Sequence, residues 1–461
     1  MRILETLSWA EIAMALRAKP LGSPLGVPGG ASIDTRTLEP GDIFFALVGE
    51  HVDGHEHVTS AFEKGASCAV MKDANRAPAG RFALVVEDPQ TALFELARLV
   101  RSRSPAAFVA VTGSAGKTTA KEFTAELLRA RGEVLATRGN LNNHLGVPLT
   151  LARLETHHWA AVVECGMSRA GELRHLVDLI RPKVAVVTNV AAAHLEYFAS
   201  VDEIAAAKAE IFETLGPGDT AIAPADEPRL TSRAKGSFAT RLFGPGEGSA
   251  VRAKDATMTL EGSRFQLVCD GSRVEVTLPA PGPHAISNFL AAAAVALALG
   301  MPAEAIAERA RLLKPGGNRG SVRRLQDDIL LIDDTYNSNP RALLSAIETL
   351  ALAKDRRKVA CIGEMLELGA SSAELHREAG AALGARVDLL LGVGALAGEI
   401  LSGASSLPPS AKRVFENSIE LAKSIGALVR SHDAVLVKGS RGVRMERVVE
   451  ALVAAHPGAT A

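Results

Sequence analysis

The sequence predicts an α/β protein of three domains, and length, composition and two internal breaks support this. The chain has 461 residues, which at roughly 150 residues per domain suggests about three domains. Nearly half of the residues (47%) are apolar, enough to form several cores. Two segments rich in chain-breaking residues, Ser102–Pro105 and Leu313–Gly320, divide the chain. We therefore expect domains over residues 1–105, 106–318 and 319–461.

The first domain is expected to combine short strands with helices. Apolar runs of strand length occur at Ile43–Val48, Cys68–Met71 and Phe82–Val86. A longer segment, Thr91–Arg101, repeats its apolar residues at the helical period and predicts a helix near the end of the domain. This composition indicates a mixed α/β domain.

The second domain alternates strands and helices. Apolar runs predict strands at Ala107–Thr112, Trp159–Cys165 and Val184–Thr188. Helical patterns follow at Lys117–Arg131 and Val201–Leu215. Continuous apolar strands between helices are typical of a parallel sheet that is covered on both faces.

Residues 251–278, near the end of the second domain, interrupt the alternation of strands and helices. Residues 251–278 contain alternating runs such as Arg264–Cys269 and Arg273–Leu278, which predict a small antiparallel β insert. Strand–helix alternation then returns, with predicted strands at Ile329–Ile332, Lys358–Ile362, Asp388–Val393 and Ala434–Val437. This alternation indicates a Rossmann-like α/β domain.

Charge and cysteine content exclude several classes of protein. Lys and Arg total 51 against 52 for Asp and Glu. The chain therefore lacks the excess positive charge that is typical of proteins that bind nucleic acids. The four cysteines, Cys68, Cys165, Cys269 and Cys361, show no CxxC spacing, which argues against a disulfide framework or zinc site. The longest apolar run, Phe289–Leu299, is too short to span a bilayer. We expect a cytoplasmic monomer without membrane insertion.

A glycine-rich segment between a predicted strand and helix is the strongest functional signal. It reads Thr112, Gly113, Ser114, Ala115, Gly116, Lys117, Thr118 and Thr119. Glycines let backbone N–H groups surround phosphate oxygens, and the helix N-terminus adds positive potential. Lys117 can reach the β- and γ-phosphates, and the Thr118 hydroxyl can bind Mg²⁺. Since Val111 stands where the general pattern has glycine, this is a shorter variant; the alternative is an ordinary strand–helix turn.

Two residues at predicted strand ends are candidates for the same site. Glu164 ends an apolar strand, where a carboxylate would lie beside the phosphate loop and could bind Mg²⁺. The alternative is a solvated glutamate or a helix cap. His194 follows the next strand end, and the alternative for it is a surface histidine.

Lys208 lies in the middle of an apolar helical stripe. Ser200 and Glu203 form a capping box that begins a helix, and Ile204, Lys208 and Ile211 then fall on one face. The side chain could extend its ammonium to water at the edge of the stripe. It could instead be a partly desolvated amine with a lowered pKa, ready for chemistry. The sequence leaves both readings open.

Taken together, the motifs resemble the Mur ligases, the ATP-dependent amide ligases of peptidoglycan precursor synthesis. The resemblance extends over essentially the whole chain. Besides the phosphate loop, it rests on Ser32–Arg36, Pro40–Leu47, Asp53–His55, Gly139–Pro148, Asp333–Pro340 and Lys438–Arg441.

The resemblance implies an ATP- and Mg²⁺-dependent centre in the second domain. It implies that Lys117 binds ATP phosphates, that Thr118, Glu164 and His194 serve two Mg²⁺ ions, and that Lys208 is carbamylated. Lys117, Lys208 and His194 would be the catalytic residues. The remaining implied nucleotide contacts are Asn288, which would meet adenine, and Arg319, Asp334 and Asn337.

The resemblance also implies the reaction and the substrates. It implies that D-alanyl-D-alanine is joined to UDP-N-acetylmuramoyl-tripeptide through an acyl phosphate. The first domain would bind the nucleotide-sugar through Ser32, Asp34, Thr35 and Arg36. The other implied substrate contacts are Asn140, Asn142, Asn143, His144, Lys438, Ser440 and Arg441.

Three other functions would be consistent with part of these motifs. A sister ligase that adds a single amino acid would share the same centre, as would a folylpolyglutamate-type ligase. The Asp34–Arg36 pattern argues against the folate enzyme. A regulatory or transport-coupled ATPase would need only the second domain, and it would release phosphate without joining two substrates.

Overall fold

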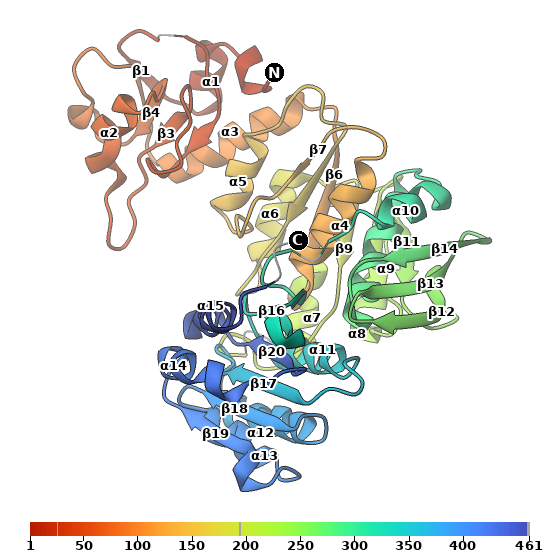
Figure 1. Cartoon of the computed structure of the whole chain (residues 1–461). Helices are drawn as coiled ribbons and strands as arrows, with labels where there is room; N and C mark the ends of the chain where they lie inside the picture. Colours follow the sequence, from red (N-terminus) through yellow and green to blue (C-terminus); the bar gives the residue numbers. More distant parts are fainter. Residues whose placement is uncertain (25, 193–194, 315, 459–461) are drawn as a thin grey trace.

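Three β-sheets, one from each successive part of the chain, organise the described residues (Figure 1). The structure is a computed structural model that describes residues 1–24, 26–192, 195–314 and 316–458. The predicted mixed α/β fold class is confirmed. Within these ranges no helix is both long and apolar enough to cross a membrane. The four cysteines are buried free thiols.

The first sheet has the order β1-β5-β4-β3-β2, with only β1 antiparallel to its neighbour. The three predicted strands are present; Cys68–Met71 has the predicted bounds, and the other two are shorter than expected. The strands are β1 (Lys19–Leu21), β2 (Ala31–Ser32), β3 (Ile43–Phe45), β4 (Cys68–Met71) and β5 (Ala83–Val85). The helices are α1 (Trp9–Ala15), α2 (Val58–Glu63) and α3 (Pro89–Arg103), with 3-10 turns at Leu4–Thr6, Gly54–His57 and Ala74–Arg76. The long helix α3 begins where Asp88 accepts hydrogen bonds from the backbone of Gln90 and Thr91.

The central sheet has nine strands in the order β14-β13-β12-β11-β10-β9-β6-β8-β7. Its parallel strands are β6 (Ala107–Thr112), β7 (Val134–Ala136), β8 (Ala160–Glu164), β9 (Val184–Val187), β10 (Thr220–Pro224) and β11 (Ala239–Phe243). The predicted β insert is a meander of β12 (Val251–Thr259), β13 (Gly262–Cys269) and β14 (Ser272–Leu278). It is not a separate hairpin, because β12 pairs with β11 and so continues the same sheet.

Helices cover both faces of the central sheet, as predicted. Val109 and Val111 of β6 pack with α4 and α9 on one face, whereas Phe108 and Ala110 pack with α5, α6 and α7 on the other. The helices are α4 (Lys117–Leu128), α5 (Gly146–Leu151), α6 (Glu172–Ile180), α7 (Val201–Ala209), α8 (Pro228–Thr231), α9 (Pro283–Ala298) and α10 (Ala303–Ala310), with a 3-10 turn at Glu210–Phe212. The second of these cores is continuous with that of the first sheet.

The third sheet has the order β15-β16-β20-β17-β18-β19, and only β15 is antiparallel. Its strands are β15 (Ser321–Arg324), β16 (Leu330–Asp334), β17 (Lys358–Gly363), β18 (Leu389–Val393), β19 (Lys412–Phe415) and β20 (Ala434–Lys438). Its helices are α11 (Pro340–Leu350), α12 (Ser372–Gly384), α13 (Ala397–Gly403), α14 (Ser418–Leu428) and α15 (Glu446–Ala455). Its 3-10 turns are Gln326–Asp328, Gly369–Ser371, Pro409–Ala411 and Arg441–Val443. The four predicted strands are confirmed, and β15 and β19 were not predicted.

Helices α12 and α13 approach each other closely through glycine, which yields a stability prediction. A Cβ at Gly380 would overlap the carbonyl oxygen of Ile400 in α13. We expect Gly380→Ala to lower the free energy of unfolding by about 1–3 kcal/mol, as overpacking does. Urea-induced unfolding followed by circular dichroism measures this.

The matched control for this prediction is Gly398 in α13. No atom lies within 4 Å of a Cβ built there, so Gly398→Ala should be neutral or stabilise by up to about 1 kcal/mol. Equal effects of the two substitutions would show that close helix packing is not the cause.

Candidate active site

The loop after β6 forms the centre of the candidate site. Gly113 and Gly116 have positive φ angles of 156° and 77°, which turn the loop toward the start of α4. The ammonium of Lys117 folds back over this loop and donates a hydrogen bond to the Gly113 carbonyl at 2.8 Å. Burial lowers its pKa, as does the charge of Arg319, while the carboxylates of Glu164 and Glu367 oppose the shift. A polyanion in the loop would therefore meet a cation that forms no ion pair with a carboxylate of the described residues.

Both glycines are required by close neighbours as well as by backbone angle. A Cβ at Gly113 would overlap the hydroxyl of Thr188, and one at Gly116 would overlap the side-chain oxygen of Asn288. Asn288 is buried on α9, which packs against α4. The structure therefore brings the predicted nucleotide contact Asn288 directly to the phosphate loop.

Asn189 braces the loop from the next strand and was not predicted as a site residue. Its side-chain oxygen accepts from the Ala115 N–H at 3.0 Å, and its amide donates to the Ala115 carbonyl at 2.8 Å. Its position directly after β9, beside β6, was the available signal, because polar residues at adjacent strand ends converge.

Glu164 ends β8 with one carboxylate oxygen unpaired. Its Oε1 accepts a hydrogen bond from Asn142 at 2.8 Å, and its backbone N–H donates to the Thr137 hydroxyl at 2.9 Å. Oε2 is buried without a hydrogen-bond partner among the described residues. A buried, orphaned carboxylate oxygen beside a phosphate loop fits a magnesium ligand.

The other predicted metal ligands are less well defined. Thr118 is half-buried at the start of α4, and His194 lies outside the described residues. Among the residues that the structure describes, no three His, Cys, Asp or Glu side chains gather in a group able to hold a metal ion. Of the predicted ligands that the structure describes, Glu164, Thr118 and a chemically altered Lys208 could bind Mg²⁺ here.

Lys208 is buried in the last turn of α7, with 2% of its surface exposed. Of the two alternatives left open by the sequence, the one in which the ammonium extends to water is therefore wrong. Burial, reinforced by the charge of Lys117, lowers the pKa of Lys208 well below its ordinary value. No carboxylate among the described residues forms an ion pair with it. The amine is consequently favoured in its neutral, nucleophilic form.

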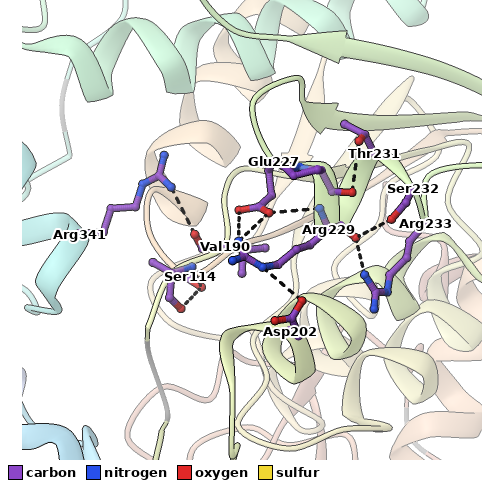
Figure 2. A network of polar contacts seen from close by, with 11 residues as sticks. Ser114, Val190, Asp202, Glu227, Arg229, Thr231, Ser232, Arg233 and Arg341 are labelled. Carbon is purple, nitrogen blue, oxygen red and sulfur yellow. Dashed lines mark hydrogen bonds and ion pairs between the residues drawn. The ribbon is translucent and has the colours of Figure 1, made fainter.

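Two residues at the start of α11, next to the third sheet, contact the phosphate loop and the segment after β9. The amide of Asn339, the N-cap of α11, donates to the Ser114 carbonyl at 3.3 Å. Figure 2 shows the guanidinium of Arg341 directed at the Val190 carbonyl, at 3.3 Å. In the same view, Asp202 of α7 contacts Arg229 of α8 at 3.4 Å. Neither Asn339 nor Arg341 was predicted, because sequence patterns do not show which face of α11 meets another domain.

A buried ion pair organises the predicted residues on the third sheet. Lys438 Nζ donates to Asp334 Oδ2 at 2.6 Å and to the Asn337 carbonyl at 2.9 Å. His284 of α9 lies close to this pair, and burial lowers its pKa. Its Nδ1 is buried without a hydrogen-bond partner among the described residues.

The other predicted residues of the third sheet, and the predicted loop residues 140–144, differ in their contacts. The Arg319 guanidinium stacks 3.5 Å from the ring centre of Tyr336, and exposed Arg441 lies at 5.8 Å from the same ring. The Ser440 hydroxyl accepts from the Leu366 N–H at 2.9 Å. The remaining loop residues differ in exposure and contacts: Asn140 and His144 are exposed, and Asn143 accepts from the backbone N–H groups of Leu145 and Gly146.

The predicted nucleotide-sugar residues form their own group on the first sheet. Arg36 Nη2 donates to Asp34 at 2.7 Å, and these hydrogen bonds lower the pKa of Asp34 to about 2. Ser32 exchanges hydrogen bonds with the Asp34 backbone, and the Thr35 carbonyl accepts from Lys64 at 2.8 Å. No contact between described residues joins this group to the phosphate loop, so the two lie apart.

Comparison with known proteins decides the family. Three family models match in order: "Mur ligase family, catalytic domain" over residues 29–101, "Mur ligase middle domain" over 111–296, and "Mur ligase, glutamate ligase domain" over 318–441. The UDP-N-acetylmuramoyl-tripeptide--D-alanyl-D-alanine ligase of Escherichia coli K12 is 38% identical, covering 91% of this chain and 92% of that protein. The chain belongs to the Mur ligase family. The resemblance predicted from the motifs is confirmed.

Solved structures agree with this assignment to the Mur ligases. A crystal structure of MurF from Acinetobacter baumannii superposes with a TM-score of 0.88 at 32% identity, covering 96% of this chain and 98% of that one. The MurF ligase of Thermotoga maritima, in complex with ADP, gives a TM-score of 0.81 at 30% identity over 92% and 96% of the two chains. These Mur ligases share the arrangement of three sheets over nearly the full length.

The contact between Gly116 and Asn288 predicts a specific effect on ligand binding. Gly116→Ala would place a methyl group against the Asn288 side chain inside the loop. We expect ADP affinity to fall by more than tenfold, about 1.4 kcal/mol, as measured by isothermal titration calorimetry.

Gly171 provides a matched control for backbone strain. It is the N-cap of α6 with a φ of 89°, and no atom lies within 4 Å of a Cβ built there. Gly171→Ala should cost stability of about 1–2 kcal/mol for the left-handed backbone and leave ADP affinity unchanged. Similar losses of affinity in both variants would contradict the proposed role of the Asn288 contact.

Proposed function

We propose that this chain joins D-alanyl-D-alanine to UDP-N-acetylmuramoyl-tripeptide in the cytoplasm, using ATP and Mg²⁺. The product is the pentapeptide precursor of peptidoglycan. The observation that carries the proposal is similarity over more than nine-tenths of both chains to ligases named for this reaction, including those of Escherichia coli and Bacillus subtilis. The MurF ligase of Thermotoga maritima was solved in complex with ADP, which supports nucleotide binding by this chain.

The reaction must first convert a poor leaving group into a good one. A carboxylate oxygen of the tripeptide attacks the γ-phosphorus of ATP, which forms an acyl phosphate and releases ADP. The dipeptide amine then attacks the acyl carbon, and a tetrahedral intermediate loses phosphate to leave the amide. Both steps bring anions together, so positioning and charge neutralisation dominate catalysis. Lys117 and the backbone N–H groups at the start of α4 would supply these contacts to the phosphates.

The residues present fit bound Mg²⁺, which when bound would neutralise phosphate charge. The unpaired Oε2 of Glu164 is the supporting observation, and we assign Thr118, Glu164, His194 and carbamylated Lys208 as the ligands. The carbamate follows from the environment of Lys208. An ammonium would repel a divalent cation, whereas the neutral amine can add to CO₂, lose a proton and become an anionic oxygen ligand.

The outer parts of the chain would bind and enclose the substrates. We assign residues 1–105 to the nucleotide-sugar, with Asp34 and Arg36 as contacts, and residues 319–461 to the dipeptide and the far side of the nucleotide. The contacts of Asn339 and Arg341 with the central domain support a closed arrangement. Closure would exclude water, which otherwise hydrolyses the acyl phosphate.

A substrate-pair assay tests the proposed activity. Phosphate release and amide formation should both require ATP, the nucleotide-linked tripeptide and D-alanyl-D-alanine. Lys117→Ala should reduce ligation by more than a hundredfold, since removing one charge from such a site costs several kcal/mol. Equal turnover with a single amino acid would identify a sister ligase, and phosphate release without either acceptor would identify an ATPase.

Lys208 gives a second test, which separates a carbamate from a structural lysine. Lys208→Ala should lose more than about 99% of activity, roughly 2.7 kcal/mol, because an anionic ligand is missing. Added acetate should restore part of the rate to Lys208→Ala and none to Lys117→Ala. Removal of CO₂ should slow the wild type. Full wild-type activity without CO₂, together with no acetate rescue, would refute the carbamate.

A further inference from the structure

A basic cavity lies at the edge of the central sheet opposite the phosphate loop. It is lined by residues where β6, β8 and β9 begin, and its volume is ≈ 860 Å³, within the range of small-molecule sites. Its described lining holds four cationic side chains, Arg101, Arg131, Arg181 and Lys183, against one carboxylate, Asp219. The length of β6, about 17 Å, separates this cavity from the phosphate loop.

Aromatic rings hold two of the arginines in fixed orientations. The Arg101 guanidinium lies 4.9 Å from the ring centre of Phe108, and that of Arg131 lies 4.6 Å from the ring centre of Trp159. Arg101 Nε also donates to the Ile180 carbonyl at 2.9 Å. Neither arginine forms an ion pair with a carboxylate of the described residues. These contacts orient the guanidinium groups without neutralising their charge.

Contacts with helix C-termini account for some of the cations in the cavity, but not for the Lys183 ammonium or the Thr214 hydroxyl. Helices α3, α4 and α6 end at this edge, and helix C-termini attract cations. Arg181, directly after α6, also pairs with Asp178. However, the exposed ammonium of Lys183 contacts no acceptor among the described residues. The Thr214 hydroxyl, also in the lining, is buried there and has no hydrogen-bond partner in the described part of the chain.

The cations of the cavity also repel one another. Burial and the charge of Arg181 lower the pKa of Arg101. The single lining carboxylate, Asp219, already accepts a hydrogen bond from the Gly216 N–H at 2.9 Å through Oδ2. An anionic ligand would relieve this repulsion and give the Thr214 hydroxyl a partner.

We propose that this cavity binds a small anion carrying two or more phosphate groups. Arginine forks match phosphate oxygens, and cations on several walls suit a ligand with charges at more than one point. The volume of the cavity suits a small molecule. A nucleic acid or a membrane surface is a poorer match, because the chain carries no net positive charge.

Tryptophan fluorescence tests the proposal locally. The chain has two tryptophans, and Trp9 lies in α1 of the first sheet. In a Trp9→Phe background, emission therefore comes from Trp159 in the cavity wall. Titration of the full-length protein with inorganic tripolyphosphate should change this emission saturably, with an apparent Kd below about 1 mM. Absence of a saturable change would overturn the proposal.

Charge variants in the Trp9→Phe background distinguish this cavity from the phosphate loop. Arg181→Asn with Lys183→Gln should weaken binding at least tenfold, and asparagine tolerates the positive φ of 48° at position 181. Exposed control changes Lys354→Gln with Arg413→Gln should retain binding, as should Lys117→Ala. Loss of the signal in Lys117→Ala but not in the cavity variant would overturn the proposal. Should the double variant misfold, Lys183→Gln alone should weaken binding at least threefold, and unchanged affinity would refute the assignment.

Discussion

The strand order of the central sheet is the constraint on which the candidate active site depends. Because β6 lies between β8 and β9 and all three are parallel, the segments that follow them reach the same edge. The strand order therefore makes the phosphate loop, Glu164 and the pair Thr188–Asn189 neighbours. Since both faces of β6 are buried, a shift of register by one residue would exchange the two faces. The packing that stabilises the sheet therefore also fixes the geometry of the loop.

Buried lysines show how neighbours, and not burial alone, determine chemistry. Lys121, Lys208 and Lys438 are all among the fully buried large side chains. Lys121 donates to the Thr137 carbonyl at 2.7 Å, and Lys438 pairs with Asp334. In both places an oxygen accepts a hydrogen bond from the buried side-chain nitrogen. Lys208 has the charge of Lys117 nearby and no hydrogen-bond acceptor among the residues that the structure describes, so the neutral amine is its favoured form. This difference is what supports a reactive role for Lys208.

The sequence predicted what local patterns encode and missed what depends on distant partners. Apolar runs located β6, β8, β9 and most strands of the third sheet, and glycine spacing located the phosphate loop. The stripe around Lys208 was also visible, although only the fold showed that its ammonium does not reach water. Strand β19 was missed because its residues are largely exposed and carry no apolar run. The joining of β12 to β11 and the contact of Asn339 with Ser114 were missed because no local pattern encodes a partner.

The two edges of a parallel sheet bind anions by different means, and the cationic cavity follows from this difference. At the edge with the phosphate loop, helices begin, so backbone N–H groups and the helix dipole favour anions directly. At the opposite edge, helices end, and their carbonyl groups repel anions. An anion site there must therefore be formed by cationic side chains, and there must be more of them than are needed to offset the carbonyl groups of the helix ends. Arg101 and Arg131 cap carbonyl groups in this way. Lys183 and the unpaired Thr214 hydroxyl, which no helix end requires, are the part of this edge that a ligand would explain.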